Sequence, residues 1–161
     1  MPETILALDP GIGRTGYAVM QYDKSKMIPL TYGCIETKSK TPTEQRLKII
    51  YDFLSQTIKK YKPTAMVLEQ VFFNTNQTTA ITVGQAQGAM LLAAAESNLT
   101  VSFVTPSQIK QTLTGYGSAQ KQQVEKMVMV LLGLTEKIKL DDTADALACG
   151  ITYFSTNKLL K

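Results

Sequence analysis

The N-terminal part of the chain alternates short apolar runs with turn residues, a pattern typical of β-strands. An apolar run over residues 5–8 ends at Asp9, a Pro-Gly turn follows, and a second apolar run occupies residues 17–20. β-Branched and aromatic residues return over residues 27–37, where Gly33 suggests a β-bulge. This pattern predicts three antiparallel strands at the start of the fold.

The next stretch changes to a helical period. Thr41-Pro42-Thr43-Glu44 predicts a capping box, with a threonine at the N-cap, a proline at the first helical position and a glutamate at the third. Apolar residues then recur every three or four positions on one face, at Leu47, Ile50, Leu54 and Ile58. We therefore expect an amphipathic helix that closes on the lysines at positions 59, 60 and 62.

The rest of the chain alternates short apolar runs with helical segments. Residues 65–68 and 101–104 predict two further strands, the first of them buried on both faces. Helices are predicted at residues 79–96, after residues 105–107, from a Ser118 cap to residue 132, and from about residue 142 to 154. Together these elements predict an α/β fold over residues 1–161 as one domain, a five-stranded mixed sheet with helices on both faces.

The predicted helix over residues 79–96 is rich in small residues, namely Gly84, Ala86, Gly88, Ala89, Ala93, Ala94 and Ala95. Small side chains at helical spacing let another backbone approach closely. Packing on the sheet and a subunit interface explain this stripe equally well.

Composition limits the chemistry. The net charge of +4 and a pI near 9.0 suit a polyanionic partner, although many soluble proteins are equally basic. With no histidine, imidazole is excluded as a base, nucleophile or metal ligand. Cys34 and Cys149 are too few for a disulfide framework and are expected to be buried thiols. The N-terminus lacks the pattern of a secretory signal, so we expect a cytoplasmic protein.

Acidic residues stand at the ends of two predicted buried strands. Asp9 and Glu69 would reach the carboxyl edge of the sheet together if their strands are parallel neighbours. Asp142 and Asp145 are three apart and share a helical face, but Asp141 and Asp145, four apart, do so too. Asp141 or Asp142 alone would suit an N-cap. Spacing favours Asp142 as the partner of Asp145.

Four carboxylates brought together would repel one another and raise one another's pKa unless cations intervened. Mg²⁺ is the expected ion, with Mn²⁺ as a substitute, because it accepts carboxylates together with phosphate and water. Such a site suggests phosphodiester hydrolysis. In the first turn, Gly11, Gly13 and Gly16 would let the backbone pass close to DNA or metal.

Five segments, LALDPGIGRTGYAV, VLEQVFF, GQAQGA, QIKQTLTGYGSAQK and DDTADALA, resemble the corresponding segments of the RuvC family. These are bacterial Holliday-junction resolvases with an RNase H-like fold. The matches occur in order over nearly the whole chain. The resemblance implies a homodimeric, Mg²⁺-dependent endodeoxyribonuclease that nicks two opposed strands of a four-way junction, with a branch-migration motor complex as a further partner. Position by position, the acidic tetrad falls on Asp9, Glu69, Asp142 and Asp145.

The resemblance also implies three DNA-contacting positions. The family's basic active-site residues fall on Lys110 and Lys121, and its aromatic wedge falls on Phe72. A lysine beside the reacting phosphate stabilises transition-state charge, although a solvated side chain is the simpler explanation, more so for Lys110. Phe72 is expected to stack on unpaired bases and Phe73 to pack in the core. Arg14, in the first turn, is a further candidate for a phosphate contact.

Other readings are compatible with parts of this pattern. Many RuvC proteins carry a histidine near the last helix, and this chain has none. The YqgF-like nucleases share the DPG turn but act on other nucleic acids, RNA included. Sugar-kinase ATPases also have such a turn, but they need a second lobe. A non-catalytic junction-binding protein is the remaining alternative, and it would have no use for four converging acids.

Overall fold

The computed structural model describes residues 1–70 and 77–158. Its sheet has the strand order β3-β2-β1-β4-β5, and β1 pairs antiparallel with β2 but parallel with β4. The five strands are β1 (Glu3–Asp9), β2 (Arg14–Asp23), β3 (Lys26–Glu36), β4 (Ala65–Glu69) and β5 (Thr100–Val104). The predicted mixed sheet is confirmed, and the parallel β1–β4 pair ends in Asp9 and Glu69 at the same edge.

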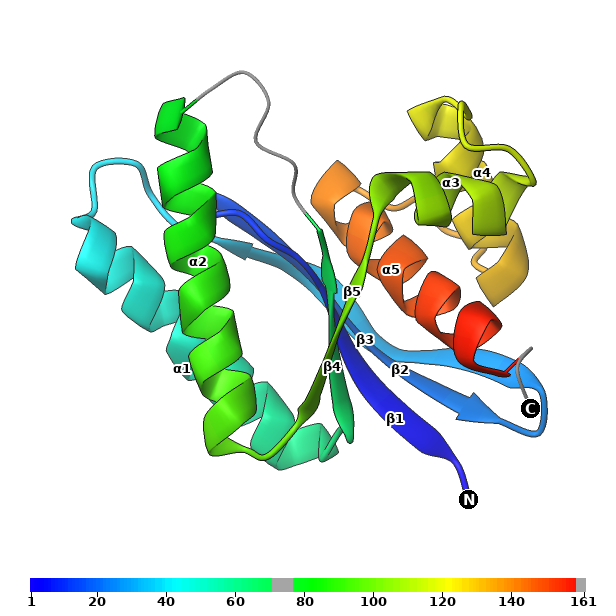
Figure 1. The fold of residues 1–161 in the computed structure, drawn as a ribbon, viewed down its shortest axis with the longest axis horizontal. Helices are drawn as coiled ribbons and strands as arrows, with labels where there is room; N and C mark the ends of the chain where they lie inside the picture. The colour runs from blue at the N-terminus through cyan, green and yellow to red at the C-terminus, as the bar shows by residue number, and fades with distance from the viewer. Residues whose placement is uncertain (71–76, 159–161) are drawn as a thin grey trace.

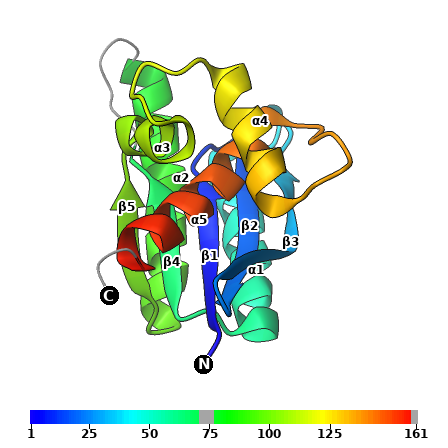
Figure 2. The same cartoon turned by 90° about the vertical axis from the view of Figure 1, so that its right-hand side faces the viewer.

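Helices cover both faces of the sheet (Figure 1). One layer contains α1 (Thr43–Tyr61) and α2 (Gln77–Glu96), and the other contains α3 (Pro106–Thr114), α4 (Lys121–Leu132) and α5 (Asp141–Lys158). Figure 2 shows α5 lying across the strands, and its contacts are mainly with β2 and β1. Each face of the sheet therefore has its own apolar core, and α5 spans the strands that carry the candidate acids.

Helix α5 lies unusually close to the sheet because two glycines leave room for it. A Cβ atom at Gly16 in β2 would stand 1.7 Å from the carbonyl oxygen of Asp142, and one at Gly150 would stand 2.3 Å from the Sδ atom of Met20. The expectation that Gly16 clears a path for DNA or metal therefore needs correction. Its missing side chain lets the first turn of α5 rest directly on β2.

The predicted bulge at Gly33 is wrong. The register of the β2–β3 pair shifts between Val19 and Met20, whereas Gly33 pairs regularly with Tyr17. A Cβ atom at Gly33 would come within 3.0 Å of the Tyr17 hydroxyl oxygen. Gly33 therefore makes room for the ring of Tyr17 on the paired strand.

The two predicted helix caps are also wrong. Helix α1 follows Pro42, one residue later than predicted, and has no side-chain cap; the Thr41 N–H donates to the Lys38 carbonyl in the preceding turn. Helix α4 follows Gln120, not Ser118, and the Gln120 N–H donates to Oε1 of Gln123 at 2.8 Å. The apolar face of α1 is confirmed, because Ile50, Leu54 and Ile58 are buried and Leu47 packs beside them.

Both cysteines are free thiols, as expected; Cys149 is fully buried, whereas Cys34 is only partly buried. Within residues 1–70 and 77–158, no helix has both the length and the apolar character needed to cross a membrane.

Candidate active site

Asp9 and Glu69 form a carboxyl pair at the ends of adjacent parallel strands. Burial first, and then the nearby charges of Glu69, Asp145 and Asp142, together raise the pKa of Asp9 to about 8. Burial, followed by the charge of Asp145, raises the pKa of Glu69 to about 7. The hydrogen bond between the two carboxyls lowers the pKa of Glu69, as expected if Asp9 is its donor. The strands therefore hold two acids in a partly desolvated, mutually repelling pair.

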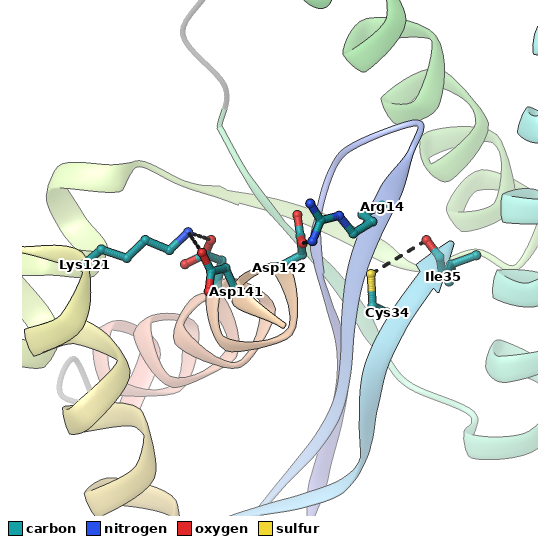
Figure 3. Close-up of polar contacts among 7 residues, drawn as sticks. Arg14, Cys34, Ile35, Lys121, Asp141 and Asp142 are labelled. Carbon is teal, nitrogen blue, oxygen red and sulfur yellow. Dashed lines mark hydrogen bonds and ion pairs between the residues drawn. The ribbon is translucent and has the colours of Figure 1, made fainter. Parts of the chain in front are cut away.

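The acids of α5 form ion pairs with arginine and lysine side chains (Figure 3). Arg14 Nη1 lies 3.5 Å from Asp142 Oδ2, and Lys121 Nζ lies 3.0 Å from Asp145 Oδ2. Lys121 Nζ also lies 3.4 Å from Asp141 Oδ2. The side chains of Asp142 and Asp145 are 26% and 28% exposed, whereas that of Asp141 is 71% exposed. Asp142 and Asp145 thus face inward and Asp141 faces outward.

The four predicted acids share one electrostatic environment. After burial, the charges that most raise the pKa of Asp9 are those of Glu69, Asp145 and Asp142, in that order. Arg14 and Lys121 are about half exposed, and each forms an ion pair with an acid of α5. This arrangement favours Asp142 over Asp141 as the fourth member of the tetrad.

The donor chemistry of the site fits a hard divalent cation, because carboxylate oxygens are the ligands such ions prefer. A cation between them would also offset the repulsion that raises the pKa values of Asp9 and Glu69. As the side chains stand in the described ranges, no three acids are spaced to hold a metal ion together. Asp142 and Asp145 would need to exchange their contacts with Arg14 and Lys121 for the ion.

A cavity of about 440 Å³ adjoins these carboxylates. Its lining includes the acids Glu69 and Asp145 together with Lys110 from α3 and Lys121 from α4. The charges of both lysines lower the pKa of Glu69. Lys110, predicted as a DNA-binding residue with a solvated side chain as the alternative, lines this cavity. Phe72 and Phe73 lie outside the described residues.

The sequence analysis missed two residues that contact the turn between β1 and β2. Thr37, just after β3, donates its backbone N–H to the Gly13 carbonyl at 2.9 Å, and its hydroxyl donates to the Ile12 carbonyl. Arg46 of α1 donates from Nε to the Thr37 hydroxyl at 2.8 Å. The contacts of Thr37 with the turn join segments more than twenty residues apart, so no local sequence pattern could have indicated them.

Comparison with known proteins gives consistent matches. The family model described as "Crossover junction endodeoxyribonuclease RuvC" matches residues 5–153. The RuvC protein of Desulforamulus reducens is 47% identical over 149 residues, which cover 92% of this chain and 91% of the relative. That of Heliobacterium modesticaldum is 48% identical over 147 residues, covering 91% of each.

Solved structures agree. The Thermus thermophilus RuvC in complex with a Holliday junction substrate superposes with a TM-score of 0.93 at 32% identity, covering 98% of this chain and 96% of that one. The yeast mitochondrial resolvase Ydc2 superposes with a TM-score of 0.73 at 14% identity, which shows a common fold alone. The family match covers most of the chain, and the fold is the expected one. The chain therefore belongs to the RuvC family of crossover junction endodeoxyribonucleases.

Proposed function

We propose that this protein resolves four-way DNA junctions by Mg²⁺-dependent paired nicking, with Asp9, Glu69, Asp142 and Asp145 as the metal-binding carboxylates. As a member of its family it is an endodeoxyribonuclease, and family membership weighs against an RNA-directed YqgF-like nuclease or a non-catalytic junction binder. The observation that carries the proposal is the convergence of acids from β1, β4 and α5 around one pair of half-buried carboxyls.

The chain's own residues divide the work of hydrolysis. Asp9 and Glu69 supply fixed ligands from strand ends, while Asp142 and Asp145 supply ligands from the first turn of α5. When bound, Mg²⁺ supplies Lewis acidity and positive charge at the phosphate. Lys121, at the N-terminus of α4, and Lys110, across the cavity, place further positive charge where the attacked phosphate gains negative charge.

Replacing Asp145 with asparagine separates binding from catalysis. We expect Asp145→Asn to bind a synthetic four-way junction within a few-fold of wild type, because the electropositive residues are retained. Cleavage with Mg²⁺ should fall by about a thousandfold or more, because a charged ligand is lost. A gel assay on a labelled junction, a linear duplex and a structured RNA measures both properties and the substrate class.

Asp52→Asn is the matched control for that experiment. Asp52 is an exposed acid on α1 that pairs with Lys48, away from the site. Its replacement should leave cleavage at the wild-type rate. Wild-type cleavage by Asp145→Asn would remove Asp145 from the metal site, and equal cutting of duplex or RNA would contradict junction specificity.

We infer that two copies of the chain act together, and the outer face of α2 supports this. Gly84 and Gly88 are exposed, and a Cβ atom at either would meet nothing within 4 Å. Ile81 and Leu92 on the same helix are 63% and 53% exposed. Packing on the sheet therefore does not explain the small residues of this face, and a two-fold dimer suits paired cuts in a two-fold junction. Sedimentation showing only monomer at high concentration would contradict the dimer.

The remaining proposals concern DNA and cellular partners. Phe72 is proposed as the wedge that stacks on unpaired bases, so Phe72→Ala should slow cleavage of mobile junctions without loss of metal binding. Arg14 is proposed to contact phosphate when it releases Asp142. The same proposed role implies a branch-migration motor as a partner, which copurification from cells would test. It also implies a cytoplasmic location, which cell fractionation would test.

A further inference from the structure

Arg46 is held against the active-site turn by one edge of its guanidinium group. Its Nε donates to the Thr37 hydroxyl at 2.8 Å, and Thr37 is itself bonded to the carbonyls of Ile12 and Gly13. The Nη2 atom lies 3.5 Å from the position that a Cβ atom would take at Gly13. Arg46 is therefore fixed to the loop that joins Asp9 at the end of β1 to Arg14 at the start of β2.

The far edge of this guanidinium has no partner within the part of the chain that the structure describes. An arginine has five N–H donors in a planar fork, and only Nε of Arg46 has a partner among the described residues. No carboxylate in residues 1–70 or 77–158 lies within ion-pair distance of it. A partly exposed arginine, anchored at one edge and open at the other, suits bidentate binding of a phosphate.

We propose that Arg46 binds a backbone phosphate of the junction beside the active site, with Thr37 as the positioning residue that orients its guanidinium. This inference rests on the proposed function, because it takes junction DNA as the ligand. Arg46 of α1 would thus add a DNA contact beside the turn between β1 and β2. The hydroxyl of Thr37 accepts from Arg46 and donates to the turn, so the arginine and the turn keep a fixed relation.

The test is equilibrium binding of a synthetic four-way junction in EDTA, across a series of salt concentrations. Arg46→Gln should weaken binding by about tenfold, as for a lost charge-assisted hydrogen bond. It should also lower the slope of log affinity against log salt by about 0.9 per protomer, the value expected for one phosphate contact. Lys59→Gln removes the same charge at the other end of α1, about 20 Å away, and should leave the slope unchanged.

The positioning role of Thr37 is tested by junction binding in variants that differ in the hydroxyl group, because a general loss of stability would not follow the hydroxyl. Thr37→Val keeps the size of the side chain but removes the hydroxyl, so binding should weaken although no charge is lost. Thr37→Ser keeps the hydroxyl and should restore binding. In the double variant with Arg46→Gln, Thr37→Val should add little, because the two residues act as one unit.

Two results would overturn the proposal. Wild-type affinity and salt slope in Arg46→Gln would show that no phosphate is bound there. A slower cleavage rate at saturating enzyme, with unchanged binding, would show that Arg46 only supports the turn. Cleavage by the wild-type protein is scored separately. A wild type that binds junctions but does not cut them would count against the proposed function and not against Arg46, whereas a wild type that does not bind junctions would overturn both.

Discussion

The strand-borne and the helix-borne acids of the site are held in different ways. Asp9 and Glu69 end adjacent strands and are hydrogen-bonded to each other, and burial with mutual repulsion raises both pKa values. Asp142 and Asp145 lie in the first turns of α5, and each is paired with a basic residue. The sheet thus fixes one half of the site by backbone pairing. The other half depends on the docking of α5. Its carboxylates are paired with the basic side chains of Arg14 and Lys121, which would compete with a metal ion for them.

The largest effect should come from the buried end of the strand-borne pair. Asp9→Asn should lower junction cleavage by about a thousandfold or more, because the charges of the three other acids all act on Asp9 and a charged ligand is lost. The asparagine is nearly isosteric, so junction binding should persist. Single-turnover cleavage with Mg²⁺ measures the loss. Retention of more than about a tenth of the wild-type rate would show that the strand pair is not the centre of the site.

The same variant should change the pH dependence of stability. The pKa values of Asp9 and Glu69 are raised from 3.8 and 4.5 to about 8 and about 7. Between those limits the folded state binds more protons than the unfolded state, so in EDTA the free energy of unfolding of the wild type should fall as pH rises from about 4 to about 8. Asp9→Asn should reduce this fall. Urea denaturation at several pH values tests it, and equal slopes in both proteins would contradict the raised pKa of Asp9.

The next effect separates the two halves of the site without changing any acid. Gly16→Ala places a Cβ atom 1.7 Å from the carbonyl oxygen of Asp142, a backbone contact that cannot give way without moving α5. We expect about 3 kcal/mol lower stability and about hundredfold slower cleavage, since Asp142 and Asp145 move away from the strand pair. Thermal unfolding and cleavage at a temperature where the variant is folded measure the two effects.

Gly33→Ala is the matched control in the same sheet. Its Cβ atom would meet the Tyr17 side chain at 3.0 Å, and a side chain can shift more easily than a backbone. Its cost should therefore be smaller, and cleavage by the folded protein should stay near wild type. Equal losses in both glycine variants would mean that the docking of α5 has no special part in assembling the site.

The sequence predicted the features of this site that depend on local pattern. Apolar runs that end in an acid located Asp9 and Glu69, and an apolar face three to four residues apart predicted α1 and α5. Features set by distant segments were missed. The β2–β3 register shift is not one of them, because it lies beside Pro29, a residue typical of bulges. The contacts of Thr37 with the turn between β1 and β2, by contrast, join residues more than twenty positions apart. The contact between Gly16 and α5 also exists only once the sheet and helix pack together.

The smallest effect concerns the choice between Asp141 and Asp142, which spacing alone could not make. The side chain of Asp141 is 71% exposed. Its ion pair with Lys121, at 3.4 Å, is longer than the 3.0 Å pair between Lys121 and Asp145. Exposed ion pairs contribute about 0–1 kcal/mol, so Asp141→Asn should change the cleavage rate by less than about threefold, whereas Asp142→Asn should lower it by about a hundredfold or more. Both variants remove one charge from neighbouring positions of the same helix turn, so a general loss of negative charge would affect them equally. Parallel single-turnover assays distinguish the cases, and a larger loss in Asp141→Asn would assign the helix-borne ligand to Asp141 and leave Asp142 as a partner of Arg14 alone.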